Sequence, residues 1–175
     1  FGRKNEWIIP ELLKWTDDRQ EIRRLSLRKE ALYREIVVEK GISPLPGVHV
    51  FLERLKTAGV PTCIGSSTHR ANIDTILDVM GFTGFFGGIV TAEDVDQGKP
   101  HPEVFLKAAA KTGRSPERCI VFEDALAGIQ AARAGGMKVV GVATTHPAGD
   151  LHMTDRVVHR LDELTVADLS ALVSS

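Results

Sequence analysis

Residues 119–136, CIVFEDALAGIQAARAGG, decide the fold class of this chain. The apolar run CIVF is typical of a strand that is buried on both faces of a sheet. Two carboxylates, Glu123 and Asp124, follow it directly, and an alanine-rich helix pattern ending in two glycines comes next. A strand that passes at once into a helix is the repeating unit of α/β proteins. Adjacent carboxylates at the end of a buried strand are costly unless a cation offsets their charge, so we expect one here.

The same alternation of apolar strand and amphipathic helix continues along the chain. The other expected strands lie within VPTCIGSS at 60–67, FGGIV at 86–90, KVVGVAT at 138–144 and RVVHRLDEL at 156–164. The other expected helices lie within residues 47–59, 68–81, 101–113 and 165–175. Repeated units of this length predict an α/β fold: a Rossmann-like parallel sheet with helices on both faces.

The first forty residues have a different texture. Apolar positions repeat at helical spacing over Trp7–Trp15 and again over 22–37, which predicts two amphipathic helices. Asp17 and Asp18 lie between them and suit a helix cap. The segment GISPLPGV at 41–48 then breaks the pattern with two prolines and two glycines, so we place a boundary there, between residues 1–43 and 44–175.

Composition excludes some classes of partner. The chain has 22 Lys and Arg against 23 Asp and Glu, so its net charge is -1 and nothing attracts it in bulk to nucleic acid or to a membrane. No stretch approaches the roughly 18 apolar residues of a membrane span. We expect a soluble monomer, with cytoplasm and plastid stroma both left open as its compartment. Cys63 and Cys119 each lie in an apolar run and are expected to be buried, reduced thiols.

Polar residues that suit a phosphate site follow three of the expected strands. They are Ser66, Ser67 and Thr68 after the first strand, Lys99 in the loop after the second, and Glu123 and Asp124 after CIVF. In open parallel sheets ligands bind at the carboxyl ends of the strands. A helix that starts after Ser66 would offer free N–H groups to an anion, and Lys99 would add a positive charge. Glu123 and Asp124 suit Mg²⁺, which prefers a few carboxylates together with water and phosphate oxygens.

Each of these signals has a plain structural alternative when it is taken alone. Ser66 and Ser67 suit a helix cap, and so do Glu123 and Asp124. Lys99 in a Gly-Lys-Pro turn suits a solvated loop. Their order along the chain and their shared positions at strand ends are what favour the phosphate site.

At this point the sequence resembles the haloacid dehalogenase-like hydrolases, in the branch with an inserted helical cap that contains β-phosphoglucomutases and many small-metabolite phosphatases. IGSST is similar to the second motif of the family, GKPHPEVF to the third, CIVFEDALAGIQAARAGGM to the fourth, and PLPGV to the return from cap to core. The resemblance implies that Ser66 binds the transferring phosphoryl group, that Lys99 stabilises it, and that Glu123 and Asp124 hold Mg²⁺.

The resemblance also implies a domain division and a substrate class. Residues 44–175 would be the α/β core, and residues 1–43 would be the C-terminal part of the cap. Lys4 and Asn5 near the cap's substrate-facing loop, and His69 and Arg70 beside the phosphate site, become candidates for substrate binding, with ordinary surface residues as the alternative. KNEWIIPELLKWTDD is similar to the cap of plant riboflavin-pathway phosphatases, which act on 5-amino-6-(5-phosphoribitylamino)uracil.

The first motif of the family is missing from this chain. That motif is a strand ending in Asp-x-Asp, whose first aspartate is the nucleophile and whose second is the general acid and base. Asp94-Val95-Asp96 has the spacing but lies in the loop before Lys99, and we interpret it as a solvated loop. In the family the missing strand lies between the strand ending at Ser66 and the one ending at Glu123. We therefore expect a truncated or processed chain that an N-terminal segment of the same protein completes, because both neighbours would otherwise expose unpaired backbone.

Three hypotheses for function follow. The first is a Mg²⁺-dependent phosphatase of a small phosphorylated metabolite, acting through an aspartyl-phosphate whose nucleophile lies upstream. The second is a sugar-phosphate mutase similar to β-phosphoglucomutase. The third is a catalytically inactive interaction module. Residues 1–175 alone are expected to be inactive because they lack the nucleophile.

Overall fold

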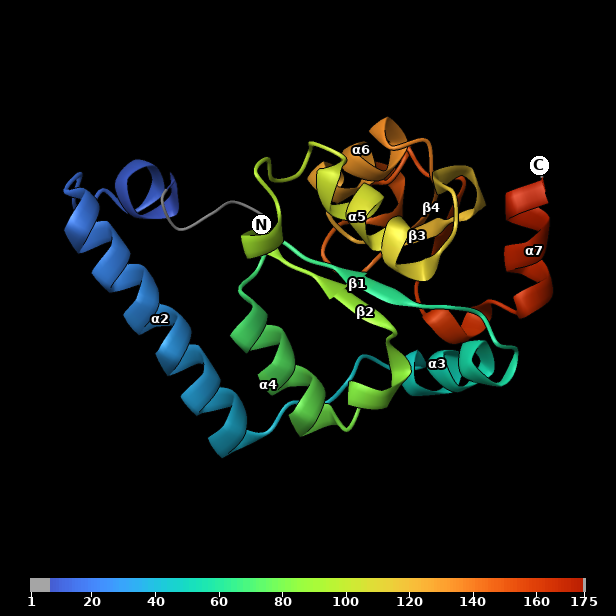
Figure 1. The fold of residues 1–175 in the computed structure, drawn as a ribbon, viewed down its shortest axis with the longest axis horizontal. Coiled ribbons are helices and arrows are strands. Elements are labelled where there is room, and N and C mark those ends of the chain that lie inside the picture. The colour runs from blue at the N-terminus through green and yellow to red at the C-terminus, as the bar shows by residue number, and fades with distance from the viewer. Residues whose placement is uncertain (1–6, 175) are drawn as a thin grey trace.

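The computed structural model describes residues 7–174 of the chain (Figure 1). Its helices are α2 Arg19–Lys40, α3 Val48–Thr57, α4 Arg70–Met80, α5 Glu103–Thr112, α6 Leu126–Ala134 and α7 Val166–Ser174. Its strands are β1 Cys63–Gly65, β2 Gly88–Val90, β3 Ile120–Glu123, β4 Lys138–Val142 and β5 Arg156–Val158. A π-helical turn spans Ile8–Leu12, and 3₁₀ turns span Thr83–Phe85, Ala92–Asp94, Pro116–Arg118, Ala148–Asp150 and Leu161–Glu163. Strands alternate with helices from β1 to β4, which confirms the predicted α/β class.

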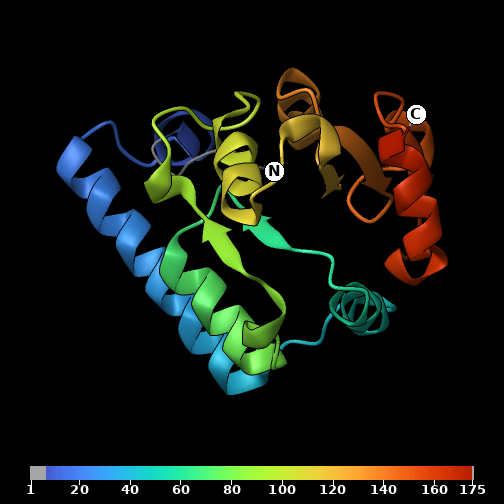
Figure 2. The ribbon, with the colours of Figure 1, turned by 45° about the vertical axis from the view of Figure 1, so that its right-hand side comes forward.

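The five strands form two separate parallel sheets (Figure 2). The first pairs β1 with β2, so that Ile64 lies opposite Ile89. The second has the order β3-β4-β5, with Val121 opposite Val139. No ladder joins β1 to β3 within residues 7–174, so each of these strands has a hydrogen-bonded neighbour on one side only. The sheet is therefore interrupted between the strand before Ser66 and the strand ending at Glu123, where the sequence analysis expected a strand to be missing.

Helix α3 packs against both sheets on one face. Its Phe51 belongs to a buried cluster that includes Val140 of β4, and the Phe51 ring meets that of Phe122 edge-on at 5.2 Å. The next residue, Leu52, belongs to another cluster, to which Ile64 of β1 contributes. Neighbouring positions of one helix thus hold strands of different sheets at a fixed separation.

Helix α5 does the same on the other face. Figure 1 shows α5 above β1 and β2, with α3 and α4 below them. Val104 and Phe105 of α5 lie in a cluster with Val90 of β2, and the same cluster includes Val121 of β3. Apolar burial of this kind contributes about 25 cal/mol per Å². The two sheets are therefore clamped from both faces although no strand ladder connects them.

The N-terminal region differs in part from the prediction. The first expected helix, over Trp7–Trp15, is reduced to the π-helical turn Ile8–Leu12, of which only Ile9 is buried. Pro10 has no N–H to donate within that turn. The second expected helix is confirmed as α2, which packs along α4, and Asp18 caps it by accepting a 2.8 Å hydrogen bond from the Glu21 N–H. The boundary near residue 43 lies in the segment between α2 and α3 and stays a prediction.

The two cysteines are free thiols, but they are half-buried and not fully buried as expected. Each lies at or next to the start of a strand, where one side of the chain remains accessible. Partial burial raises the pKa of both thiols. Among the helices described, none is long and apolar enough to cross a membrane.

Candidate active site

An ion pair between Lys99 and Glu123 joins the two sheets. Lys99 lies in the loop after β2, and Glu123 is the last residue of β3, so each comes from a different sheet. The Lys99 ammonium contacts Glu123 Oε1, and the two side chains are only 11% and 10% exposed. The same ammonium lies 4.5 Å from the centre of the Phe105 ring, within the range of a cation–π contact. The structure thus brings together two predicted site residues that are 24 positions apart.

The Glu123 carboxylate is fixed by backbone as well as by Lys99. Its Oε2 accepts hydrogen bonds of 3.1 Å from the N–H groups of Asp124 and Ala125. Its carboxyl group packs directly on Gly128 of α6: a Cβ atom at that position would lie 2.1 Å from Glu123 Cδ. No side chain caps α6, so the capping alternative for Glu123 and Asp124 is not what the structure shows.

Asp124 is held by the loop after β4. One of its carboxylate oxygens, Oδ2, accepts a hydrogen bond from the Thr145 hydroxyl. Glu123 and Asp124 together present hard oxygen ligands, which fit Mg²⁺ in kind. The described residues contain no group of three His, Cys, Asp or Glu side chains arranged to hold a metal ion. Two carboxylates alone leave most of the coordination of a divalent cation to water, phosphate oxygens or further protein groups.

Ser66 lies where β1 ends, beside the end of β2. Its N–H donates to the carbonyl of Val90 at 2.9 Å, which continues the β1–β2 ladder by one bond. Its hydroxyl oxygen accepts a 3.2 Å hydrogen bond from the Thr68 N–H. The Thr68 carbonyl in turn accepts from Ala92 N–H at 3.2 Å. The Ser66–Thr68 segment is therefore a defined loop tied to β2, as a site at this edge of the sheet requires.

The first N–H of α4 is not free, which corrects one expectation. Helix α4 starts after His69, and the Arg70 N–H donates to Glu93 Oε2 at 2.8 Å. The second oxygen of Glu93 lies 3.0 Å from His69 Nδ1. These contacts, the Arg70 N–H first, lower the pKa of Glu93 below its ordinary value. A carboxylate already occupies the start of α4, so in this structure an anion would meet the Ser66–Thr68 loop and not that helix end.

The loop that carries Lys99 is braced by Glu103. The Glu103 carboxylate accepts from Lys107 Nζ at 2.6 Å and from the Gln97 N–H at 2.9 Å. The Lys107 contact is the main reason that the pKa of Glu103 falls to about 2. Asp94 is exposed, as expected for a solvated loop, and it also forms a capping box with Thr91, whose N–H and hydroxyl donate to it at 2.7 and 2.8 Å.

The sequence model of the haloacid dehalogenase-like hydrolases matches residues 4–136, which is most of the chain. The chain belongs to this family. It is 38% identical to the chloroplastic 5-amino-6-(5-phospho-D-ribitylamino)uracil phosphatase of Arabidopsis thaliana over 99% of the chain and 46% of that protein. It is 34% identical to protein CbbY of Rhodobacter capsulatus over 74% of the chain and 59% of that protein. The chain therefore spans less than two thirds of the length of either curated relative.

Solved structures of the family share the fold. A hydrolase of the family from Entamoeba histolytica superposes with a TM-score of 0.89 at 27% identity, over 99% of this chain and 80% of that one. β-Phosphoglucomutase from Clostridium difficile superposes with a TM-score of 0.85 at 25% identity, over 99% of this chain and 78% of that one. The two half-sheets thus have the arrangement of strands in members of this family.

The remaining site residues predicted for this haloacid dehalogenase-like hydrolase are less closely gathered. Arg70 turns along α4, where its guanidinium donates to Asp74 at 2.8 Å. His69 directly follows the Ser66–Thr68 loop in the chain, and its Nδ1 lies 3.0 Å from Glu93 Oε1. Lys4 and Asn5 lie outside the described residues.

Sequence reasoning missed the residues that support the site: Glu93, Glu103, Gly128 and Thr145. Only the capping box of Thr91 and Asp94, the pattern T-x-x-D, carried a readable local signal. Glu93 lies inside that pattern.

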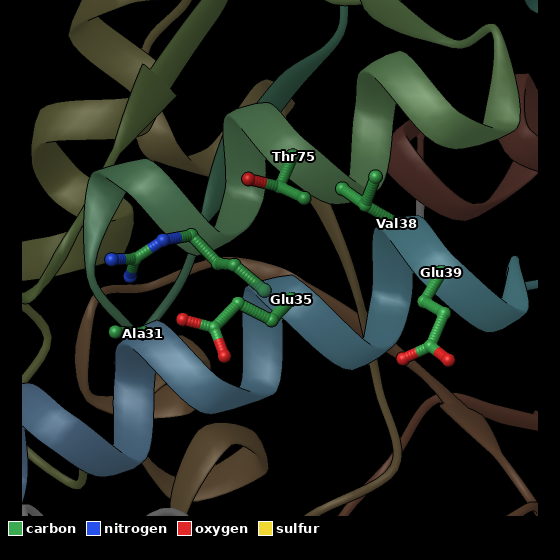
Figure 3. Close-up of a pocket in the computed structure, with 6 residues that line it drawn as sticks. Ala31, Glu35, Val38, Glu39 and Thr75 are labelled. Atoms are coloured by element: carbon green, nitrogen blue, oxygen red, sulfur yellow. The ribbon is translucent and has the colours of Figure 1, made fainter.

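An open depression of about 510 Å³ lies between α2 and α4 (Figure 3). It is lined by Ala31, Arg34, Glu35, Val38, Glu39 and Thr75. None of the predicted site residues lines it. The depression therefore lies apart from the site predicted at the strand ends.

Proposed function

We propose that this chain carries most of the active site of a Mg²⁺-dependent phosphatase of small phosphorylated metabolites. The observation that carries the proposal is the partly buried Lys99–Glu123 pair at the junction of the two sheets, with Asp124 beside it. A buried ion pair is weak evidence for stability, because its desolvation cost rivals its attraction. The position of the Lys99–Glu123 pair at a strand end, in a member of a hydrolase family, favours a role in binding a charged ligand.

We further propose that a strand from a segment of the same protein outside residues 7–174 completes the sheet between β1 and β3. Both strands have one side without a ladder partner, while α3 and α5 hold the two sheets apart from both faces. Parallel pairing on both sides would satisfy the backbone groups that β1 and β3 direct toward each other. That strand would deliver the nucleophilic aspartate beside Lys99.

The proposed reaction has two steps. The aspartate oxygen attacks phosphorus while the bond from phosphorus to the leaving oxygen breaks, and the second aspartate of the missing motif protonates that oxygen, giving an aspartyl-phosphate and a free alcohol. The same second aspartate then takes a proton from water, which attacks phosphorus, releases inorganic phosphate and restores the first aspartate. Lys99 offsets negative charge on the phosphoryl oxygens, and the Ser66 hydroxyl, whose oxygen accepts from the Thr68 N–H, donates its own proton to one of them.

Glu123 and Asp124 would hold the cation. Bound Mg²⁺ would neutralise charge on the phosphoryl group and fix its orientation. Asp124 would be oriented by Thr145, and Glu123 by the two amides that already bind its Oε2. Lys99 holds the Glu123 carboxylate in place through their ion pair.

The substrate that we propose is 5-amino-6-(5-phosphoribitylamino)uracil. Its support is the 38% identity to the Arabidopsis phosphatase over nearly the whole chain, including the region expected to be cap. His69 and Arg70 beside the phosphate loop would help to choose the substrate, together with Lys4 and Asn5. We propose a monomer whose partner is this small metabolite, without nucleic acid or membrane.

A sugar-phosphate mutase is the second candidate, supported by the structural likeness to β-phosphoglucomutase. It would transfer the phosphoryl group to a second hydroxyl instead of to water. The third reading, an inactive interaction module, is disfavoured because such a module has no need of a buried ion pair beside a second carboxylate.

The test uses the protein in its full natural length with Mg²⁺ and three substrates: 5-amino-6-(5-phosphoribitylamino)uracil, flavin mononucleotide and β-glucose 1-phosphate. We expect release of inorganic phosphate, fastest from the first, and loss of at least about 100-fold in kcat/KM for Ser66→Ala. Ser170→Ala is the matched control, because the Ser170 hydroxyl donates to the Val166 carbonyl within α7, and it is expected to change kcat/KM less than about threefold. Isomer formation without phosphate release would favour the mutase, and inactivity on all three would overturn the phosphatase.

Residues 1–175 alone are proposed to be inactive. Among the described residues, the carboxylate beside Lys99 is Glu123, which the proposed mechanism assigns to the cation. Phosphate release by this chain at the rate of the whole protein would contradict both this inference and the completing strand.

A further inference from the structure

A buried polar cluster connects α2 to the loop that carries Ser66. Its members are Glu30 and Arg34 of α2, Asn72 of α4, and Thr68. Asn72 is only 2% exposed and Glu30 only 7%. The cluster lies at the contact between α2 and α4, which are far apart in sequence but run side by side in Figure 1.

Asn72 is the centre of this cluster because it contacts all three other members. Its Nδ2 donates to Glu30 Oε2 and also lies 3.3 Å from Thr68 Oγ1. Its Oδ1 accepts a 2.8 Å hydrogen bond from Arg34 Nη1. One amide side chain therefore touches the N-terminal helix on one side and the loop after β1 on the other.

Packing alone does not explain the cluster. Burying a carboxylate and an amide costs free energy unless every polar atom is satisfied, and apolar residues would join two helices without that cost. Helix α2 already buries Ile22 and Val37 elsewhere along its length. Hydrogen bonds differ from apolar contacts in being directional, so the cluster fixes one relative placement of α2 and α4.

Thr68 passes this placement on to Ser66. The Thr68 N–H donates to Ser66 Oγ at 3.2 Å, and the Thr68 carbonyl accepts from Ala92. The Thr68 hydroxyl meets Asn72 at 3.3 Å. A displacement of Asn72 therefore reaches the Ser66 hydroxyl through one intervening residue.

We propose that Asn72 is a positioning residue that couples the placement of α2 to the orientation of the Ser66 hydroxyl. When α2 is seated, Glu30 and Arg34 hold Asn72, Asn72 holds Thr68, and the phosphate-binding loop is ordered. When α2 shifts, the loop loses the contact of Thr68 with Asn72 and keeps only its backbone hydrogen bonds to Val90 and Ala92. Helix α2 belongs to the region expected to be cap, which would enclose the substrate, and the Ser66–Thr68 loop would bind the substrate's phosphate. In this respect the coupling rests on the proposed function.

The first test measures hydrogen–deuterium exchange of the Ser66–Thr68 amides by mass spectrometry in the full-length protein. Asn72→Asp places two carboxylates face to face, and we expect exchange at these amides to rise about tenfold. Glu30→Gln combined with Asn72→Asp reverses donor and acceptor and is expected to restore exchange to within about threefold of the wild type. Failure of the double variant to recover would overturn the proposal.

A variant on α2, away from the Ser66–Thr68 loop, distinguishes the proposed coupling from a general loss of folding. Glu30→Ala leaves Asn72 and the loop intact, and we expect it also to raise exchange at Ser66–Thr68. Glu35→Ala is the matched control: it lies on the same helix, is 60% exposed, and contacts Arg28 and not Asn72. Equal exchange at these amides in the Glu30→Ala variant, the Glu35→Ala variant and the wild type would overturn the coupling.

The second readout is kinetic and separates this proposal from the proposed function. Asn72→Asp is expected to lower kcat at least tenfold with KM changed less than about threefold, because the Ser66 hydroxyl acts mainly on the transferring phosphoryl group. Glu30→Gln in the same chain is expected to restore kcat. If the wild-type protein hydrolyses no phosphomonoester, the proposed function fails, while the exchange measurements still decide the coupling.

Discussion

For the substitution Gly128→Ala, helix propensity predicts a gain in stability, whereas the tertiary structure predicts a loss. Gly128 lies within α6, and replacing a helical glycine by alanine ordinarily stabilises a protein by about 0.5–1 kcal/mol. Here the new Cβ would lie 2.1 Å from both Cδ and Oε1 of Glu123. Ordinary contact starts at 3.4 Å, so the carboxyl group must move by 3.4 − 2.1 = 1.3 Å.

That movement separates Glu123 from its partners. The N–H groups of Asp124 and Ala125, which bind its Oε2, belong to the backbone and do not follow a movement of this size. Overpacking in a filled site costs roughly 1–3 kcal/mol. Subtracting the propensity gain leaves a net loss of about 1 kcal/mol, which for a chain of 175 residues lowers Tm by roughly 2–4 °C.

The assay is thermal unfolding of the full-length protein together with a Mg²⁺ titration of phosphatase activity. We expect a lower Tm and a fall of at least about tenfold in apparent Mg²⁺ affinity, because Glu123 is displaced. Gly149→Ala is the control, since its Cβ would meet nothing within 4 Å. A Gly128→Ala variant with raised Tm and unchanged Mg²⁺ dependence would refute the reasoning.

Three further predictions concern the supports of the site and of the C-terminal helix. Lys99→Met leaves the Glu123 carboxylate without its cation, and we expect kcat/KM for phosphate release to fall at least about 100-fold while circular dichroism stays unchanged. Glu103→Gln removes a carboxylate whose pKa in the folded protein, about 2, lies below its ordinary value of 4.5. The ionised carboxylate therefore stabilises the fold above pH 4.5, and this stabilisation is lost as the pH falls through about 2. We expect the difference in Tm between the variant and the wild type to shrink between these two pH values. Asp168→Asn weakens the hydrogen bonds from the Thr165 N–H and hydroxyl, at 2.8 and 2.6 Å, and we expect a lower midpoint of urea unfolding; an unchanged midpoint would mean that the start of α7 is not anchored there.

The strand ends show how far local sequence reasoning reaches. The run CIVF followed by Glu123 and Asp124 predicts a buried strand with carboxylates at its end, because apolar continuity and abrupt polarity are both local features. Lys99 was assigned to the same site from its order in the chain. Its partner in the structure is Glu123, and that pairing depends on how the two sheets are held, which no local pattern contains.

The α4 start shows where local reasoning fails. Ser66 and Ser67 precede a helix pattern, so an anion site with free amides was expected there. The structure fills that place with Glu93, which comes from the next strand's loop and caps the Arg70 N–H. A cap supplied from another element leaves no trace in the sequence around the helix it caps.

The sequence by itself determined the α/β class, the order of strands and helices, and the residues at the strand ends, because these follow from the period of apolar positions and from local turn chemistry. The resemblance to the family, whose first motif is missing here, is what placed the interruption of the sheet between the strand before Ser66 and the strand ending at Glu123. Only the tertiary structure decided that α3 and α5 hold the half-sheets in place, that Gly128 makes room for the Glu123 carboxylate, and that Asn72 joins α2 to the Ser66 loop. Those features arise from contacts between residues far apart in sequence, and such contacts are fixed by packing in three dimensions.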